Sequence, residues 1–592
     1  MCGIAGIMMR EGGRVDPTVL DWLTKALEHR GPDGSGRYVG DRVGLINTRL
    51  AIIDLVTGDQ PFESADGVVS VANGEIYNDP QIRSALAGIA FRSRSDCEPP
   101  LYVYREKGLD FTGELRGMYA IAIYDRAKDR LVLARDPFGI KQLYFVETPD
   151  YFAFASEAQA LIAAGLAESR TVPAKSSELL QLKFTTGRGC IFSQIERLLP
   201  GETIVVANGK IVERRRQHVL PLGNKRSHAV RDPLHRLDEI LADSVAAHVR
   251  SDVPYGLFLS GGIDSSTILA LMARISTQPV CAFTAAFPNS GAADESHAAR
   301  RVANAVGAAH HVVELTQADF WTEAPRIAAA LDDPTTDAAA LPTFKLAAAA
   351  RQAQIKVVLS GEGADEIFGG YSRYRRAAWL GGLFARRSRN RGVLDEFLYG
   401  AVLPHFAGWR DGLQHIEKEF VGTGWSAVQK LQAVDCAEWL PNDLLVKLDR
   451  CLMANSIEGR TPFLDPIVGP FGFALPDALK VKGNFGKWLL RKWLSVHLPE
   501  AGAFERKKGF NPPVGEWIDA YKEKLLPLLC AQPGIAELSL AAAARKALEN
   551  PIKNAQAAWS LVFYGLWHSH HVLRVRADGS IGDVLATAAK MG

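Results

Sequence analysis

The second residue of the chain is the first that could do chemistry. Cys2 directly follows the initiator Met1, and cysteine is small enough for that methionine to be removed. Removal would leave a free α-amine, whose ordinary pKa is about 7.7–8.0, on the residue that carries the thiol. Such an amine can act as general base for its own side chain, as in N-terminal nucleophile enzymes. The alternative is a solvent-exposed cysteine without a role.

A glycine-rich loop offers a second kind of chemistry. The segment SGGIDSS, residues 260–266, lies between an apolar run and a helical one. Glycines there let backbone N–H groups approach phosphates, and the helix N-terminus adds positive potential. The segment lacks the lysine of a Walker loop, which disfavours a kinase or GTPase, whereas Asp264 offers a carboxylate to Mg²⁺. A strand-to-helix turn without a ligand is the alternative.

The elements that must position Cys2 are short β-type runs. Over the first two hundred residues, these runs are separated by the turn-forming residues Gly, Asp and Asn. We expect strands at Val43–Thr48, Val68–Ala72, Met118–Tyr124, Leu131–Ala134, Leu143–Val146 and Thr203–Val206, and helices near Pro17–Arg30 and Asp79–Gly88. This pattern predicts a mostly antiparallel, layered α+β domain over residues 2–215.

The glycine-rich loop belongs to a different pattern, in which strands and helices alternate. A polar stretch from Arg214–Arg216 to Lys225 predicts a linker, assigned to residues 216–232, before the second domain at 233–592. That domain is predicted to have helices at Pro233–Arg250, Ser265–Arg274 and Asp294–Val306, and strands at Val253–Leu259, Pro279–Ala286, Val312–Leu315 and Ile355–Ser360. The alternation indicates an α/β fold with a parallel sheet. Beyond about residue 425 the pattern is mainly helical.

Composition places the chain among ordinary folded proteins of more than one domain. It has 592 residues, 47% of them hydrophobic, and 68 basic against 66 acidic side chains give a formal charge of +2. This balance provides no basic footprint for nucleic acid. No apolar run approaches the roughly 20 residues that cross a bilayer, and the N-terminus does not resemble a signal peptide. The seven cysteines are scattered and include no CxxC pair, so we expect a cytoplasmic protein.

Five segments connect the first domain with a known family. They are MCGIAG at the N-terminus, RGPDG (30–34), RLAIIDL (49–55), NGEIYN (73–78) and RDPFGIKQLY (135–144). In this order they resemble the glutaminase domain of class II glutamine amidotransferases. The resemblance implies an N-terminal nucleophile fold, an αββα sandwich, in which Cys2 attacks the side-chain amide of glutamine. It also implies an oxyanion hole from Asn73 and Gly74, and glutamine binding by Arg49, Glu75 and Asp96.

One segment departs from this family's pattern. The family usually continues from the Ser-Asp pair with Thr, Glu and aliphatic residues, whereas here Asp96 is followed by Cys97, Glu98 and two prolines, Pro99 and Pro100. Proline is tolerated in the first turn of a helix. We therefore expect a shifted helix start with glutamine binding retained.

The second domain resembles the synthetase domain of the glutamine-hydrolysing asparagine synthetase family, which has an ATP pyrophosphatase fold. The segments that carry this resemblance are SGGIDSS, LSGEGADEIFGGY (359–371), NSIEGRTPFLD (455–465) and KKGF (507–510). The resemblance therefore spans essentially the whole chain. It implies that ATP activates a carboxylate as an acyl adenylate, and that ammonia then displaces AMP. An internal ammonia tunnel between the two sites is implied by the family alone.

The resemblance also implies roles for residues of the second domain. Asp264 and Asp365 would bind Mg²⁺, and Glu362 would deprotonate the attacking ammonium, with nearby Glu366 raising its pKa. Lys507 would stabilise the departing pyrophosphate, with Lys508 as the alternative. The implied ATP-binding residues are Phe258, Ser260, Gly261, Gly262, Asp264, Ser265, Ala285, Ser360 and Gly361.

The acceptor carboxylate is the open question at this point. Aspartate is the leading candidate, which makes glutamine, aspartate and ATP the expected substrates. Dedicated asparagine synthetases often carry an arginine in the loop that corresponds here to residues 332–342, DDPTTDAAALP, and this loop has none. Another basic residue could serve instead. The alternative is an acid in a peptide or surface-polysaccharide precursor.

Other classes of protein fit the sequence less well. β-Lactam synthetases lack a working N-terminal cysteine, and phosphoribosyl amidotransferases and glucosamine phosphate synthases share only the first domain. A scaffold role would require dead sites, and the motif residues are all present. We expect His310 and His311 to be structural residues before a strand, the C-terminal tryptophans to be core, and Arg386–Arg391 to be a solvated insertion. A homodimer is the family expectation.

Overall fold

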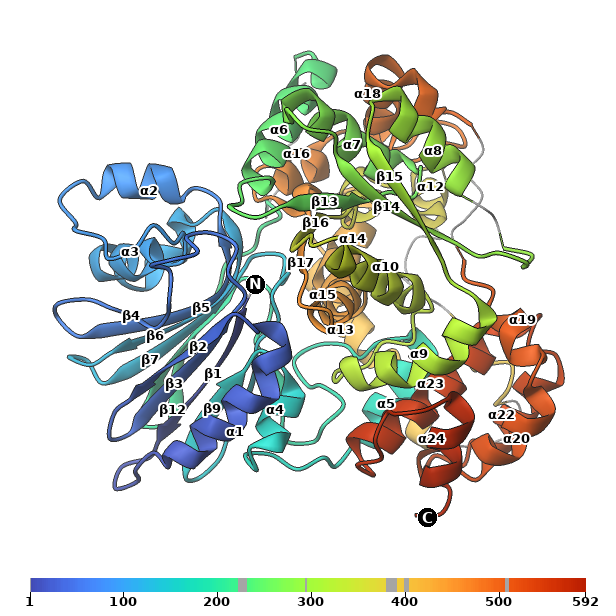
Figure 1. The fold of residues 1–592 in the computed structure, drawn as a ribbon, viewed down its shortest axis with the longest axis horizontal. Coiled ribbons are helices and arrows are strands. Elements are labelled where there is room, and N and C mark those ends of the chain that lie inside the picture. The colour runs from blue at the N-terminus through green and yellow to red at the C-terminus, as the bar shows by residue number, and fades with distance from the viewer. Residues whose placement is uncertain are drawn as a thin grey trace.

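The computed structural model describes residues 2–221, 231–292, 295–379, 391–398, 404–505 and 511–591. Two six-stranded antiparallel sheets form the N-terminal part of the chain, and a five-stranded parallel sheet lies in the C-terminal part (Figure 1). Both predicted fold classes are therefore confirmed.

The N-terminal sheets have the strand orders β10-β8-β9-β1-β3-β2 and β12-β11-β7-β6-β5-β4. The first comprises β1 (Cys2–Met9), β2 (Gly34–Val39), β3 (Val43–Arg49), β8 (Tyr144–Glu147), β9 (Tyr151–Ala155) and β10 (Glu196–Arg197). The second comprises β4 (Phe62–Glu63), β5 (Val68–Ile76), β6 (Gly117–Asp125), β7 (Arg130–Arg135), β11 (Glu202–Ala207) and β12 (Lys210–Arg216). The predicted strands exist, and the chain adds others, including β1.

Residue alternation along β1 explains why these sheets stack between helices. Ile4 and Met8 point into a cluster shared with the second sheet. Ala5 and Ile7, on the opposite face, pack with helix α1 (Pro17–Leu27) and α4 (Ala158–Ala163). Helices α2 (Asp79–Ala85) and α3 (Pro99–Lys107) cover the outer face of the second sheet. The result is the αββα sandwich, with helices on both outer faces (Figure 1).

The parallel sheet has the order β15-β14-β13-β16-β17. Its strands are β13 (Tyr255–Phe258), β14 (Cys281–Ala286), β15 (Ala309–Glu314), β16 (Val357–Leu359) and β17 (Glu458–Arg460). Two expectations need correction. His310 and His311 lie on β15, not before it, and β17 was not predicted because three residues give no periodic signal. His310 Nε2 lies 2.8 Å from Thr284 Oγ1.

Helices flank this sheet and fill the C-terminal region. They include α6 (Pro233–His248), α7 (Ile263–Ile275), α8 (Ser296–Ala305), α9 (Gln317–Ala330), α10 (Ala340–Gln352), α11 (Ala364–Phe368), α12 (Ser372–Trp379), α13 (Asp411–Glu419), α14 (Ala427–Val434), α15 (Leu445–Met453), α18 (Trp488–His497) and α23 (Ala555–His571). Trp493, Trp559 and Trp567 are fully buried, which confirms their prediction as core. No described helix is long and apolar enough to span a membrane.

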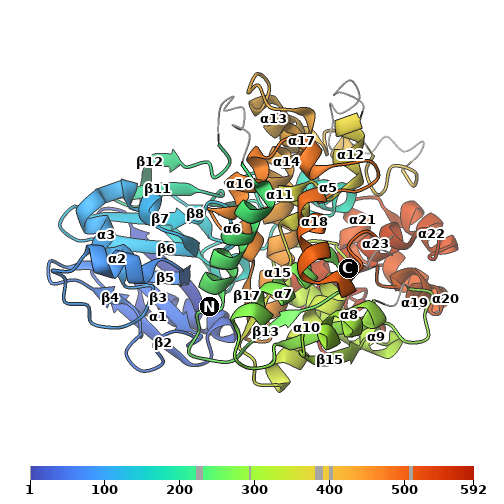
Figure 2. The same ribbon diagram turned by 90° about the horizontal axis from the view of Figure 1, so that it is seen from above.

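The two parts of the chain share apolar core. Leu50 and Phe138 of the N-terminal part belong to one buried cluster with Leu440 and Phe463, and the two parts lie against each other along their length (Figure 2). Arg214–Arg216, predicted to open the linker, instead complete β12, where Arg214 pairs with Glu202. Residues 222–230 of the predicted linker, Asp294 and Arg386–Asn390 lie outside the described residues.

Candidate active sites

Strand pairing brings the first two predicted glutaminase residues together. Cys2, the first residue of β1, lies opposite Arg49, the last residue of β3, in an antiparallel register. The Cys2 N–H donates to Asn73 Oδ1 at 3.0 Å, and the Cys2 carbonyl accepts from Arg30 Nε at 3.2 Å. Both polar groups of the Cys2 backbone are therefore held by side chains, which fixes the position from which the thiol acts.

The side-chain amide of Asn73 has a hydrogen-bond donor that no described residue uses. Its side chain is completely buried on β5, and its Nδ2 group makes no hydrogen bond to any described residue. A buried donor without a partner is costly, so a site that supplies a negatively charged oxygen would satisfy it. Gly74 follows, and a Cβ there would lie 2.1 Å from the Met118 carbonyl. Only glycine therefore fits next to Asn73.

The other predicted glutamine-binding residues surround this strand. Asp96 Oδ2 accepts from the Ile76 N–H at 2.6 Å. Burial raises the pKa of Asp96 to about 6, and the Ile76 hydrogen bond lowers it only in part. Glu75 lies 3.0 Å from Arg460 Nη2, and burial raises its pKa well above the usual range despite this arginine. Arg49 Nη1 donates to Asp59 at 2.8 Å.

The helix after Asp96 begins at the first of the two prolines. α3 starts at Pro99, and the Glu98 carboxylate accepts from the N–H groups of Arg92 and Ser93, each at 2.8 Å. Cys97, which replaces the family's threonine, donates to the Gly74 carbonyl at 3.5 Å. Burial raises the pKa of the Cys97 thiol, so this cysteine stays protonated. The two prolines leave Asp96 buried within the site.

The phosphate-type loop follows β13, at the carboxyl end of the parallel sheet. Ser260 Oγ lies 3.2 Å from Ser265 Oγ and accepts from the Gly262 N–H at 3.2 Å. Gly261 has a φ of +66°, and a Cβ there would lie 2.6 Å from the Ala299 nitrogen. Phe258 ends β13, and Ala285 lies on the neighbouring strand β14. Ligands of open α/β sheets bind at this edge.

Two predicted metal ligands converge in space from distant segments. Asp264 lies in the first turn of α7, and Asp365 lies on α11 after the second motif. Lys487 joins them, because its Nζ lies 2.6 Å from Asp264 Oδ2 and 2.7 Å from Asp365 Oδ1. The pKa of Lys487 is raised because the two carboxylates outweigh its burial.

Lys487 is a site residue that the sequence analysis missed. It directly precedes α18 with a φ of +52°, and no motif among those we matched contains it. The pair of carboxylates fits Mg²⁺, which commonly takes one or two carboxylates together with substrate phosphates. The described residues contain no group of three or more His, Cys, Asp or Glu that could hold a metal. Water molecules and phosphate oxygens would complete the metal's shell.

The pKa of Glu362 is raised, but the neighbours that contribute most to this shift are not the one that the sequence suggested. Burial raises its pKa, Lys447 lowers it from 4.0 Å, and Asp337, Asp365 and Asp264 raise it further. Glu366 was the expected cause, but its Oε1 accepts from the Tyr371 hydroxyl at 2.6 Å. Burial raises the pKa of Glu366 to about 8. The two glutamates of this motif therefore interact with different neighbours: Glu362 with Lys447, and Glu366 with Tyr371.

Residues 332–337 open the loop 332–342, which lacks the arginine that dedicated asparagine synthetases often carry there, and the carboxylates of this segment pair with different cations. Asp332 and Asp333 are buried and pair with Arg450 and Arg197, with nitrogen–oxygen distances of 2.6 Å in both cases. Asp337 at the other end pairs with Lys447 at 3.0 Å and Lys183 at 3.4 Å. Only the Asp337 end therefore approaches Glu362.

Arg460 connects the two sites. Its side chain pairs with Glu75 in the N-terminal site, and its carbonyl accepts from the Ser360 N–H at 2.9 Å. Gly361 follows Ser360, and a Cβ on it would lie 2.8 Å from Asp264 Cβ, so the two motif loops are in contact. Lys507 and Lys508 lie outside the described residues.

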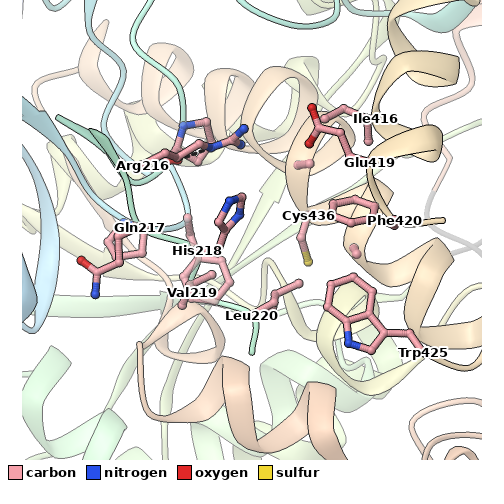
Figure 3. Close-up of a pocket in the computed structure, with 15 residues that line it drawn as sticks. Arg216, Gln217, His218, Val219, Leu220, Ile416, Glu419, Phe420, Trp425 and Cys436 are labelled. Atoms are coloured by element: carbon pink, nitrogen blue, oxygen red, sulfur yellow. Dashed lines mark hydrogen bonds between the residues drawn. The ribbon is translucent and has the colours of Figure 1, made fainter. Parts of the chain in front are cut away.

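A separate pocket lies where the chain crosses between its two parts (Figure 3). His218 and Leu220 line one side of it, and Phe420, Trp425 and Cys436 line the other, around an open space of about 520 Å³ that includes its mouth. None of the residues implied in catalysis lines this pocket. It is therefore distinct from both candidate active sites.

Comparison with known protein families accounts for both parts of the chain. A family model described as a glutamine amidotransferase domain matches residues 1–217, and one described as asparagine synthase matches residues 236–569. The chain is 29% identical to "Asparagine synthetase [glutamine-hydrolyzing] 1" of Bacillus subtilis, covering 97% of each protein. It is 32% identical to a "Putative asparagine synthetase [glutamine-hydrolyzing]" of Mycobacterium tuberculosis, with 96% of this chain and 97% of the relative covered.

A relative with a different printed name has a similar level of identity. The chain is 30% identical to "Amidase chry2" of Gibberella zeae, with 91% of this chain and 93% of the relative covered. The full-length architecture is thus shared by proteins whose names give different activities.

Proposed function

The chain belongs to the asparagine synthase family, and from this premise we propose that it is a glutamine-dependent asparagine synthetase with aspartate as acceptor. Family membership makes it an ATP-dependent amidotransferase ligase. The observation that carries the proposal is the presence of two half-sites in one chain, joined by Arg460. One half-site presents a nucleophile beside a donor without a partner, and the other presents two carboxylates around one cation.

In the N-terminal half-site, the Cys2 thiol loses its proton to the α-amine and attacks the δ-carbonyl of glutamine. Asn73 Nδ2 and the Gly74 N–H donate to the oxygen on which negative charge develops. Ammonia leaves with the transferred proton, and water hydrolyses the thioester to give glutamate. Arg49 binds the substrate's α-carboxylate and Asp96 its α-ammonium, each by opposite charge.

In the second half-site, the acceptor carboxylate attacks the α-phosphorus of ATP and displaces pyrophosphate. Asp264 and Asp365 would hold Mg²⁺, which supplies charge neutralisation to the phosphates when bound. Lys487 places a further positive charge beside both carboxylates. Glu362 takes a proton from the incoming ammonium, a role for which its burial-raised pKa is suited. Ammonia then attacks the acyl carbon, and AMP leaves.

A different carboxylate acceptor is the second candidate, and a specific observation favours it. The α-carboxylate of aspartate needs a cation, and Lys447, which lies 4.0 Å from Glu362, already pairs with Asp337, as does Lys183. An acceptor without a second carboxylate would not need to compete for them. The amidase relative provides independent support for this alternative.

Pyrophosphate release from purified protein, ATP, Mg²⁺ and glutamine tests the proposal. We expect release to depend on aspartate and mass spectrometry to detect asparagine. Glutaminase activity without aspartate-dependent pyrophosphate would exclude aspartate and favour another carboxylate.

The variant Cys2→Ala tests whether glutamine hydrolysis and ammonia-dependent synthesis take place at separate sites. We expect it to lose glutamine-dependent synthesis by at least about 10³-fold, because the nucleophile itself is removed. Synthesis supplied with ammonium salts should stay within about twofold of the wild type. Loss of both activities would contradict separate half-sites.

A further inference from the structure

A continuous path of buried charges runs from the synthetase part to the nucleophile. Asp332 Oδ1 accepts from Arg450 Nε at 2.6 Å, and Arg450 Nη1 donates to Asp449 Oδ2 at 2.8 Å. Asp449 accepts from Arg30 at 2.8 and 3.2 Å, and Arg30 Nε donates to the Cys2 carbonyl at 3.2 Å. Four contacts therefore connect residue 332 with residue 2.

Every side chain on this path is removed from water. Asp332 is 0% exposed, Arg30 and Arg450 are each 1% exposed, and Asp449 is 4% exposed. The pKa of Asp449 is lowered because Arg30 and Arg450 outweigh its burial. Buried pairs are weakly screened, and removing one partner leaves an uncompensated charge. If one charged side chain of the path is displaced, the side chain that pairs with it loses its partner and is expected to move as well.

The path begins on elements that also carry the synthetase chemistry. Helix α15 contains Asp449 and Arg450, and two residues earlier it contains Lys447, which lies 4.0 Å from Glu362. The loop that begins at Asp332 ends at Asp337, the partner of Lys447. The helix thus carries both Lys447, the neighbour of Glu362, and two members of the path, and the loop carries both Asp332 and the partner of Lys447.

We propose that Asp449 and Arg450 are positioning residues that hold the glutaminase nucleophile from the synthetase side. Arg30 belongs to the N-terminal part, but its guanidinium direction is fixed by Asp449 and by Glu157, which accepts from it at 2.7 Å. The Cys2 carbonyl depends on that guanidinium for its hydrogen bond. The catalytic geometry of one domain is therefore set in part by the other. This inference rests on the proposed glutaminase function.

The chain provides a matched control in the adjacent residue of the same loop. Asp333 is as buried as Asp332 and also crosses between the two parts of the chain, pairing with Arg197 and Tyr144. Among the described residues, no hydrogen bond joins Asp333, Arg197 or Tyr144 to Cys2, and Arg450 of the path lies over the Tyr144 ring, 5.7 Å from its centroid. Asp449→Asn and Asp333→Asn each remove one buried negative charge at nearly constant volume, and only the first lies on the path.

The experiment compares glutaminase kinetics of the two variants at matched thermal stability, measured as Tm. We expect Asp449→Asn to lower the glutaminase kcat by about 10–100-fold with KM for glutamine nearly unchanged, since small misplacement of a reacting group has effects of this size. Asp333→Asn should stay within about twofold of the wild type. Asp449→Glu, which restores the charge, should recover part of the loss.

A second measurement reports the nucleophile directly. Iodoacetamide labelling of Cys2, followed by mass spectrometry of its peptide, should slow in Asp449→Asn and not in Asp333→Asn. Equal losses in both variants, or no loss in Asp449→Asn, would overturn the inference. A wild-type protein without glutaminase activity would overturn the proposed function as well, which separates the two failures.

Discussion

The two half-sites of this chain are held in place by different forces. Cys2, Asn73 and Glu75 stand on paired strands, and Asp96 is hydrogen-bonded to the backbone of one of them. Asp264, Glu362 and Asp365 stand on loops and helix starts, and side-chain charges bring them together. The backbone ladder therefore sets the strand positions of the first site, and the Arg30–Asp449 ion pair acts on the Cys2 carbonyl, whereas ion pairing assembles most of the second site.

Exposure follows the same division. Asn73, Glu75 and Asp96 are at most 4% exposed, whereas the side chains of Glu362 and Asp365 are 25% and 33% exposed. A backbone-built pocket for a small amino acid can be closed in advance. A site that must admit a nucleotide has to stay more open, and charged side chains can reorganise when the charges of the nucleotide arrive.

The largest expected effect comes from removing one charge of the ion-paired site. Asp264→Asn should lower ATP-dependent pyrophosphate release by about 10³-fold, because it removes one of the two carboxylates proposed to hold Mg²⁺ against the phosphates. Pyrophosphate release with saturating ammonium is the measurement, and the glutaminase kcat of the same variant is its control. An equal loss in both activities would mean that the two sites are not held independently.

A somewhat smaller effect is expected from the backbone-built site. Asn73→Ala removes the amide donor and should lower the glutaminase kcat by about 10²–10³-fold with little change in KM, which is the usual cost of one oxyanion donor. Hydrolysis of glutamine followed as glutamate release checks this. If KM rose and kcat did not fall, Asn73 would be a binding residue and not a transition-state donor.

The smallest effect is a pH dependence from Asp96. Burial raises the pKa of Asp96 to about 6, so the carboxylate that we propose binds the substrate ammonium becomes protonated below that pH. The α-amine of Cys2 already gives a slope of one below about pH 8. We therefore expect the slope of log(kcat/KM) against pH to steepen from one to two below about pH 6.

The matched variant for this profile is Asp96→Asn, whose slope should remain one. A wild-type slope that stays at one down to pH 5 would contradict the role of Asp96. The raised pKa of Asp96 also makes the free energy of unfolding depend on pH. The folded state holds this proton more tightly than the unfolded state, so the contribution of Asp96 to the free energy of unfolding is largest below about pH 4. That contribution is lost as the pH rises through about 6.

Much of the fold could be predicted from local patterns. Alternating runs predicted the antiparallel strands, and alternating strands and helices predicted the parallel sheet. The errors lie where local signals are weak. β17 has three residues, His310 and His311 look like polar residues before an apolar strand, and Arg214–Arg216 look like a linker although they complete β12.

The candidate sites divide in the same way. Cys2, Asn73 and Asp264 lie in short motifs whose residue types are tied to strand and loop positions, so the sequence is enough to identify them as candidates. Lys487 does not lie in any of the motifs that we matched. Its identity as a site residue depends on Asp264, 223 positions earlier, and no periodicity connects the two. The predicted influence of Glu366 on Glu362 failed for a related reason, since neighbours in sequence on a helix start point to different partners.

The sequence by itself determined the residue types on which the proposed chemistry rests, because a thiol at the second position and glycine-rich turns after strands restrict what the backbone and side chains can do locally. Only the tertiary structure decided which charges meet. The chain has 68 basic and 66 acidic side chains, and spacing does not say that Arg30 pairs with Asp449 across 419 residues. Electrostatic attraction becomes strong only after burial removes water, so such pairs are specified by the folded core and not by the residues alone.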